Sequence, residues 1–291
     1  MLTAALISGL GLGSMYGLMA LGFYVTYAVS GTVNFAQGSS MMLGAVLSYT
    51  LSVTLGWPVG AAIVLALGGC ALWGLVVELL AVRPFVQRGS DAWLMATVAL
   101  GMVLDNTVLF TFGKEPRNQP SALAESPLQI GEVGLGVYPL QLLIPVIGLA
   151  LAAALHTLSR RTRWGTALLA VVQNRAAARL MGIPIRRAVA LAFALSAVFA
   201  GVAGVLIAPL YNVNADMGTL FGLKAFAVAM LGGITSAWGV MLAGLLFGVV
   251  EALITSTLGS GYTQILSFAL VIAALAWRPN GLFGRAEVKK V

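Results

Sequence analysis

Seven apolar runs, two of them short, constrain this chain more than any other feature of its sequence. They lie near residues 4–29, 37–54, 59–82, 92–112, 138–158, 188–210 and 262–277. The hydrocarbon core of a bilayer is about 30 Å thick, so a helix of roughly 20 apolar residues crosses it. The chain is 60% hydrophobic and only 9% charged, which leaves too little polar surface for a soluble protein of 291 residues. These features predict an all-α, polytopic bundle of transmembrane helices that forms a single domain over residues 1–291.

The distribution of cations predicts the orientation of the bundle. The first apolar run has no Lys or Arg and is longer than the core of a cleavable signal, so we expect it to remain as the first helix. Thirteen of the sixteen Lys and Arg residues lie in segments 83–91 and 160–187 and in the tail from Arg278. Cytoplasmic loops carry such an excess, and the other side would hold only Lys114, Arg117 and Lys224. The N-terminus is therefore predicted outside and the C-terminus in the cytoplasm.

Residues 221–257 are predicted to form a broken hairpin. With the orientation above, this apolar segment must start and finish on the outer side, and as one helix it would be about 55 Å long, too long for one crossing. A turn at 231–236 with a shorter first arm fits better, which gives about eight to nine spanning or partly spanning helices in all. Polar and small residues also interrupt the chain at 30–40. Two interrupted segments in the two halves of a chain indicate a substrate pathway.

Glycines recur at four-residue spacing in two of the apolar segments. Gly9, Gly13 and Gly17 share one face of the first run, and Gly244 and Gly248 share a face of a later one. Small residues at this spacing let two helices approach closely. We interpret them as packing positions within the subunit.

Polar groups at membrane depth are the candidates for a substrate pathway, because they must face the protein interior, water or a partner. Asn34 and Gln37 gain weight from the interruption beside them. For Glu251, and for Glu78, a structural bond to a neighbouring helix is an equally good interpretation. The candidate pathway residues, including the two glycines of the hairpin turn, are Asn34, Gln37, Asp105, Asn106, Gly232, Gly233 and Glu251.

The sequence offers no starting point for catalysis. The chain has one cysteine, Cys70, and one histidine, His156, so one chain cannot build a His/Cys metal site or a disulfide framework. The patterns HExxH, GxSxG and GxxxxGK[ST] are absent. We expect no catalytic residue, metal ligand or cofactor, so active transport would take its energy from another polypeptide or from an ion gradient.

The stretch 160–187 holds seven arginines and no acidic residue. It predicts one helix from about Thr166 to Met181, with Leu168, Val171, Val172 and Leu180 on one apolar face. Gly182 and Pro184 would end this helix. A basic amphipathic helix can rest on anionic lipid, and a rigid basic element can equally receive force from a partner protein.

The chain resembles the permease subunits of branched-chain amino acid ABC transporters, specifically the shorter of the two usual permeases. The resemblance covers nearly the whole length. It is carried by SMYGLMALGFYVTYAVSGTVNFAQGSSMMLGA, TRWGTALLAVVQNRAAARLMGI, GLKAFAVAMLGGITSAWGVMLAGLLFGVVEAL and RPNGLFG. It implies a subunit of an importer in the bacterial cytoplasmic (inner) membrane. The implied partners are a second permease in a heterodimer, two ATP-binding subunits, an external solute-binding protein and membrane lipid, but no nucleic acid.

The resemblance also implies that 160–187 is a coupling loop, in which a short helix docks on the ATPase subunit. Ala177, Ala178 and Gly182 match the family's motif, whereas Ala176 occupies the position where a glutamate is usual. The residues implied in coupling are Gly165, Arg175, Ala177, Ala178, Arg179 and Gly182.

Alternatives to this function remain open in the sequence. Within the same family, a urea or short-amide importer is the second choice of substrate and a sugar permease the third. An autonomous channel or ion-coupled carrier is the alternative from another class, although such a protein needs no docking helix.

Overall fold

The computed structural model describes residues 2–127, 129–130, 133–134 and 137–284. The tail cations Arg285, Lys289 and Lys290, which were counted above to orient the chain, lie outside these residues. The described chain is a bundle of helices with one two-stranded antiparallel sheet of two residues per strand. This confirms the predicted all-helical class.

The helices follow the apolar runs closely. Seven of those in the described residues are long and apolar enough to cross a membrane, and α11 is a shorter apolar helix. Helix α2 continues into the π-helical turn η1, and α3 continues through the π-helical turn η2 into α4. In chain order the elements are α1 Leu2–Ser30, α2 Gln37–Tyr49, η1 Thr50–Thr54, α3 Val59–Val77, η2 Glu78–Val82, α4 Arg83–Gln87, α5 Trp93–Phe112, α6 Ala122–Glu125, β1 Gln129–Ile130, β2 Val133–Gly134, α7 Pro139–Arg161, α8 Arg163–Gln173, α9 Arg175–Leu180, α10 Ile185–Ile207, α11 Met217–Gly232, α12 Ala237–Leu258 and α13 Ser260–Trp277.

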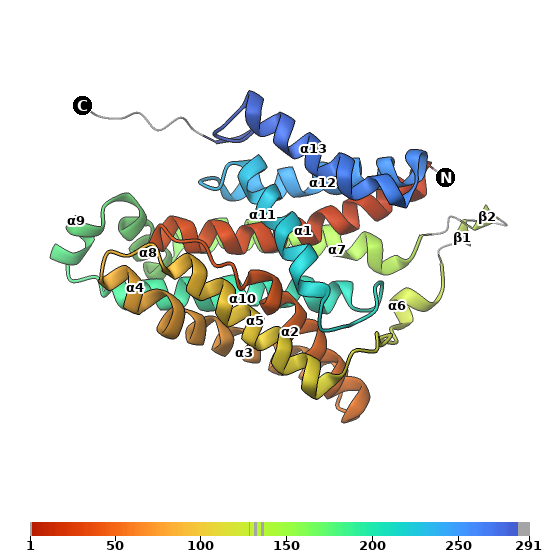
Figure 1. Ribbon diagram of the computed structural model, residues 1–291, viewed down its shortest axis with the longest axis horizontal. Coiled ribbons are helices and arrows are strands. Elements are labelled where there is room, and N and C mark those ends of the chain that lie inside the picture. The colour runs from red at the N-terminus through yellow and green to blue at the C-terminus, as the bar shows by residue number, and fades with distance from the viewer. Residues whose placement is uncertain (1, 128, 131–132, 135–136, 285–291) are drawn as a thin grey trace.

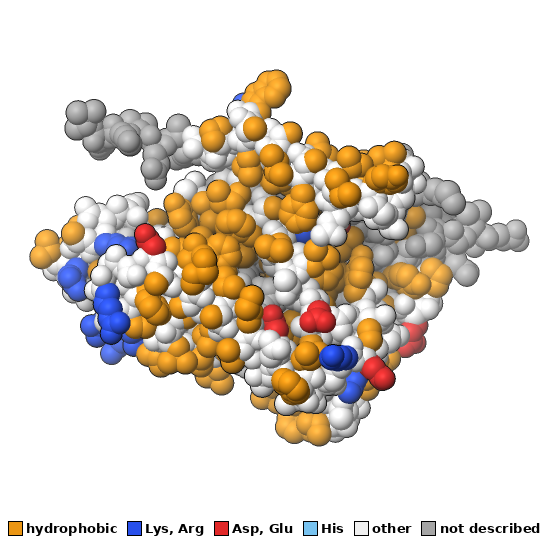
Figure 2. Space-filling view, viewed as in Figure 1, with side chains coloured by type: hydrophobic (Ala, Val, Ile, Leu, Met, Phe, Trp, Pro, Cys, Tyr) orange, Lys and Arg blue, Asp and Glu red, His pale blue; other side chains and the backbone are white. Residues whose placement is uncertain are grey.

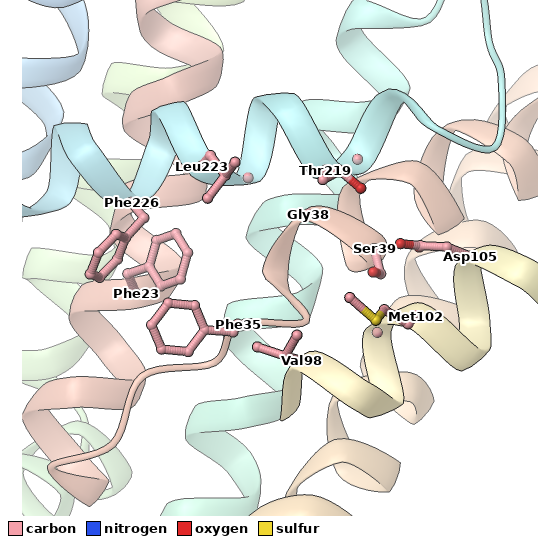
Figure 3. Close-up of a pocket in the computed structure, with 13 residues that line it drawn as sticks. Phe23, Phe35, Gly38, Ser39, Val98, Met102, Asp105, Thr219, Leu223 and Phe226 are labelled. Carbon is pink, nitrogen blue, oxygen red and sulfur yellow. The ribbon is translucent and has the colours of Figure 1, made fainter. Parts of the chain in front are cut away.

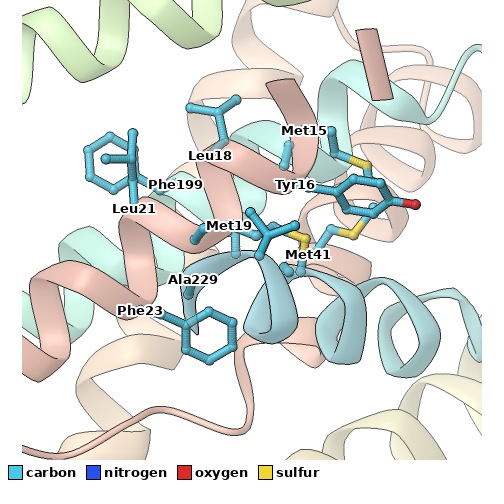
Figure 4. Close-up of a cluster of buried hydrophobic side chains, with 14 of the residues drawn as sticks. Met15, Tyr16, Leu18, Met19, Leu21, Phe23, Met41, Phe199 and Ala229 are labelled. Carbon is cyan, nitrogen blue, oxygen red and sulfur yellow. The ribbon is translucent and has the colours of Figure 1, made fainter. Parts of the chain in front are cut away.

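Helix α1 forms the centre of the bundle, with α12, α10, α7 and α11 packed around it (Figure 1). Its side chains enter the core in several directions: Tyr16, Leu18 and Phe23 are all fully or almost fully buried (Figure 4). A helix that is apolar on all sides is stable only when neighbours or lipid cover every side. The outer helices α3, α5, α7 and α13 are far less buried along their apolar windows, which suits lipid or partner contact.

Helices α1 and α12 touch along the predicted glycine faces. A Cβ atom added to Gly248 would lie 2.3 Å from the Cα of Gly13, and one added to Gly244 would lie 2.6 Å from the Cα of Gly17. No side chain fits at these distances, so the two backbones are in direct contact. The interpretation of these glycines as packing positions within the subunit is confirmed.

The bundle has two chemically different ends. Helices α4, α8 and α9 form one end, which we call the arginine end, and Figure 2 shows basic side chains gathered there. The N-terminal part of α1, helix α6 and the β1–β2 pair lie at the opposite end (Figure 1).

The hairpin predicted for 221–257 is present, with its first arm the shorter. Helix α11 has 16 residues, Gly233–Ser236 form the turn, and α12 has 22 residues. The turn lies at the arginine end, since Thr235 lines a cavity there together with Asn174 and Arg175.

The position of Lys224 differs from the one assumed when the orientation was predicted from the cations. This lysine was counted among the cations on the outer side, but it lies within α11, is buried, and forms an ion pair with Glu251 of α12. Its position therefore reflects pairing inside the bundle and gives no information about orientation.

The arginine-rich stretch also differs from the prediction. The single helix expected from about Thr166 to Met181 is wrong, because the chain breaks at Asn174, which has extended backbone angles (φ −157°, ψ 103°). The Asn174 side chain accepts a hydrogen bond from the backbone N–H of Ala177 at 3.0 Å, so it begins a new helix. The two helices therefore point in different directions. Val171 is buried whereas Leu180 is exposed, so they do not share one apolar face.

Candidate functional site

A cavity of about 160 Å³ lies between α1, α2, α5 and α11 (Figure 3). Three phenylalanines close one end of it: Phe23 from α1, Phe35 before α2, and Phe226 from α11. The Phe226 ring lies 5.6 Å from that of Phe23 and 5.2 Å from that of Phe35, between ring centroids. Because tilted rings at these distances attract one another, they form a firm apolar wall.

The other end of the cavity is polar. Ser39, Asp105 and Thr219 line it, and Figure 3 shows the Asp105 carboxyl group close to Ser39 at this end. The Oδ1 atom of Asp105 is buried and has no hydrogen-bond partner among the described residues. A buried carboxylate oxygen without a partner is costly, so this oxygen is available to a ligand or to water.

Asn34 and Gln37 lie behind the cavity wall and are fully buried. The Gln37 amide donates to the carbonyl oxygens of Met19 (3.3 Å) and Ser196 (3.0 Å), and its oxygen accepts from the Ser196 hydroxyl at 2.8 Å. Asn34 donates to Gln37 at 3.4 Å and accepts from the N–H of Ala36 at 3.0 Å. This network ties the first turn of α2 to α1 and α10, and so fixes the chain break that carries Phe35.

The other candidate pathway residues lie apart from this cavity. Asn106 is exposed on α5 and donates to the carbonyl of Met102 at 2.8 Å. Gly232 and Gly233 lie at the arginine end, where the N–H of Leu282 donates to the carbonyl of Leu231 at 2.7 Å. Of the seven candidate pathway residues, only Asp105 lines the cavity.

Glu251 and Glu78 are both engaged in ion pairs. Glu251 pairs with Lys224, and the Lys224 ammonium also lies 5.8 Å from the centre of the Tyr16 ring. Glu78 holds Arg83 through two hydrogen bonds of 3.1 and 2.7 Å. For Glu251 this is the bond to a neighbouring helix that was one of the two interpretations of the sequence. Glu78 instead bonds within the continuous helix formed by α3, η2 and α4, so the interpretation as a bond to a neighbouring helix is wrong for it.

At the arginine end, a hydrogen bond connects segment 160–187 to α1. The guanidinium of Arg175 donates to the carbonyl of Val29 at 2.8 Å, in the last turn of α1. A cation at the C-terminus of a helix satisfies free carbonyls and interacts favourably with the helix dipole. This hydrogen bond connects α9 to the end of α1 that precedes the break at 31–36.

The residues implied in coupling have different surroundings. Ala178 is buried, whereas Ala177 and Arg179 are exposed. Gly165 packs against the end of α7, where an added Cβ would lie 2.1 Å from the carbonyl oxygen of Leu158. Gly182, which was expected to help end the helix, has φ +80°, a backbone conformation that favours glycine.

Sequence reasoning missed two groups of residues. The first group is Leu180 and Met181, whose side chains are 87% and 82% exposed. The sequence signal for this exposure was their position directly before Gly182, where the helix ends. The phenylalanines of the cavity gave no signal, because in sequence they look like ordinary residues of apolar runs.

Comparison with known proteins adds an independent observation. A family model described as the permease component of a branched-chain amino acid transport system matches residues 5–275. The high-affinity branched-chain amino acid permease LivH of Escherichia coli K12 is 34% identical over 298 residues, covering 98% of this chain and 96% of LivH. BraD of Pseudomonas aeruginosa PAO1 is 34% identical over 300 residues, covering 98% and 97%.

Two further similarities are more distant. The ribose import permease RbsC of Escherichia coli K12 is 29% identical over 271 residues, covering 89% of this chain and 80% of RbsC. Among solved structures, PsaBC from Streptococcus pneumoniae in complex with a Fab has a TM-score of 0.49 and 14% identity, covering 94% of this chain and 90% of that one. The family match spans nearly the whole bundle, including the cavity and the arginine end. The chain therefore belongs to the family of permease components of branched-chain amino acid transport systems.

Proposed function

We propose that this chain is the membrane-spanning permease subunit of an ATP-driven importer and forms part of the pathway for branched-chain, hydrophobic amino acids. The observation that carries the proposal is the cavity between α1, α2, α5 and α11, with its wall of three phenylalanines. Apolar walls favour an aliphatic side chain, because transfer of each CH₂ group out of water contributes about 0.8 kcal/mol. The relatives LivH and BraD, whose names state branched-chain amino acid transport, support the same substrate class.

The cavity is poorly suited to the alternative substrates. Urea, short amides and sugars carry several hydrogen-bonding groups that must be paired when they leave water. Only three polar side chains line this cavity: Ser39, Asp105 and Thr219. A sugar that entered this cavity would leave most of its hydroxyl groups without hydrogen-bond partners. The resulting loss of binding free energy is larger than the loss from a single missing contact.

The position of Asp105 supports a second permease subunit. A carboxylate at membrane depth must face protein or water, because hydrocarbon cannot solvate it. Met102 and Leu223 line the same cavity and are exposed, so the cavity opens at the surface of this chain. A second permease placed over this face would enclose Asp105 and put the pathway between two subunits.

The arginine end is the proposed site of energy input. We place it in the cytoplasm, with the N-terminus and the 113–137 segment outside, where an external solute-binding protein would dock. Two ATP-binding subunits would contact α8 and α9. ATP can drive transport only if its binding and hydrolysis change these contacts, so that one permease conformation is favoured over another. The Arg175–Val29 hydrogen bond gives such a change a route into α1.

The proposal is tested by reconstitution of the complete complex in vesicles, with both permeases, the ATP-binding subunits and a solute-binding protein. We expect uptake of radiolabelled leucine that requires ATP and is reduced by excess isoleucine or valine, but not by ribose or urea. Leucine uptake by this chain alone, without ATP-binding subunits, would instead favour an autonomous carrier. Uptake of ribose or urea without leucine would show that the substrate class is wrong.

A further inference from the structure

The polar end of the cavity carries charge of one sign only. Among the residues that line it, Asp105 is the single ionisable side chain, and no Lys or Arg is present. The buried Oδ1 atom of Asp105 has no partner among the described residues. Figure 3 shows the Asp105 side chain at the end of the cavity away from the three phenylalanine rings. The cavity thus joins an apolar compartment to one anionic acceptor.

We infer that Asp105 binds the α-ammonium group of the transported amino acid while the three phenylalanines enclose its aliphatic side chain. This inference rests on the proposed function and deepens it. An ammonium group supplies three hydrogen-bond donors to a carboxylate, and a bond between charged partners is shorter and stronger than a neutral one. In a cavity with little water the attraction between the charges is also less screened.

The same lining leaves the carboxylate of the amino acid without a cationic partner in this chain. Ser39 and Thr219 can supply hydroxyl donors but no charge. Recognition by this subunit should therefore depend more on the amino group than on the carboxyl group. This expectation separates the inference from a cavity that only accommodates apolar side chains.

The test uses the complete complex in vesicles, without solute-binding protein, so that ligands reach the cavity directly. Met102 lines the cavity and is exposed in this chain, so a Met102→Cys variant places a thiol in the proposed pathway between the two permease subunits. We expect a cationic thiol reagent to react faster than an anionic one of similar size. Leucine and isoamylamine, which carry the amino group, should slow the reaction, whereas isocaproate, which lacks it, should not.

Variants of Asp105 then test whether its carboxyl group causes the protection by leucine and the preference for the cationic reagent. Asp105→Asn should weaken protection by leucine on the order of tenfold to hundredfold and remove the preference for the cationic reagent. Asp105→Glu should restore part of both effects. Asp91→Asn, which removes an exposed carboxylate from the loop before α5, is the matched control and should change neither.

Three results would overturn the inference: equal protection by isocaproate, no protection by leucine at all, or unchanged protection and reagent preference in Asp105→Asn. Leucine uptake by the parent complex with solute-binding protein is measured on the same preparation. If that uptake is normal, such results reject the role of Asp105 alone. If ATP-driven leucine uptake is absent, the proposed function itself fails.

Discussion

The ion pair between Lys224 and Glu251 links the two arms of the hairpin in the interior of the bundle. Their side chains are only 8% and 9% exposed, and the second carboxylate oxygen of Glu251 has no partner among the described residues. Two buried charges cost several kcal/mol to desolvate, and their attraction offsets this cost only while both are present. The pair therefore constrains how α11 can move against α12 more than it adds to stability.

Loss of one partner should be far more harmful than loss of both. We expect Lys224→Met alone, or Glu251→Leu alone, to destabilise the purified subunit by about 3–5 kcal/mol, because an unpaired charge stays buried. The double variant should recover most of this stability. Thermal unfolding of the three variants in the same detergent measures the difference. Additive losses in the double variant would mean that the two charges are not coupled.

The break at Asn174 is followed by two exposed apolar side chains, Leu180 and Met181, and we propose that this surface is where the ATP-binding subunits dock. Because a new helix begins after the break, Leu180 does not join the buried face of α8, and Met181 is exposed at the edge of a cavity that Leu168 of α8 also lines. Exposed apolar side chains at the end of a basic element are suited to an apolar cleft in a partner protein. Ala178, by contrast, is buried, so a tryptophan there would disturb folding and would say nothing about docking.

Leu180→Asp should weaken binding of the ATP-binding subunits by about tenfold or more, because a charge would be forced into an apolar contact. The measurement is the amount of ATP-binding subunit that co-purifies with the permease at matched permease concentration. Leu123→Asp on α6 is the control, since Leu123 is also exposed and apolar but lies at the opposite end. Equal recovery with both variants would place the docking surface elsewhere.

Much of the helical framework could be predicted from the sequence. The apolar run 92–112 is α5, Trp93–Phe112, and the run 188–210 is α10, Ile185–Ile207. These bounds could be predicted because a helix that crosses the membrane needs an apolar run of a certain length, and such a run can be found in the local sequence. The hairpin turn near 231–236 could also be predicted from local sequence, because glycines and polar residues interrupt an apolar run there.

The cavity and the loop could not be predicted in the same way. Phe23, Phe35 and Phe226 meet because helices distant in sequence are rotated toward a common space, and that rotation depends on packing along the whole bundle. The break at Asn174 depends on one side chain that caps the next helix, in a stretch whose apolar pattern is otherwise continuous. Lys224 misled the charge count because its partner lies in another helix.

The described bundle has an apolar middle and two unlike ends, one basic and one formed by α6, the β1–β2 pair and the N-terminal part of α1. The cavity lies between helices in the bundle, and the Arg175–Val29 contact lies at the arginine end. In the proposed function, substrate recognition and energy input would therefore involve different parts of the same helix, α1. Coupling between them then requires only that α1 and the break after it have two stable positions.

Orientation can be tested with single cysteines in the inserted protein. Ser126→Cys, exposed after α6, should react with a membrane-impermeant thiol reagent from outside intact cells. Leu180→Cys should react only after the membrane is opened. Cys70 is buried and should contribute little background. The opposite pattern of labelling would invert the bundle and remove α9 from contact with cytoplasmic ATP-binding subunits.

The central claim is that the cavity lined by the three phenylalanines is the route of the amino acid. It is tested most directly by ATP-driven leucine uptake after the cavity is filled. Val98 lines it from α5, so Val98→Trp should lower uptake by about tenfold or more while subunit assembly is kept, because overfilled space excludes the substrate. Leu72→Trp, on the exposed face of α3, should transport normally. Normal leucine uptake by an assembled Val98→Trp complex would contradict the account.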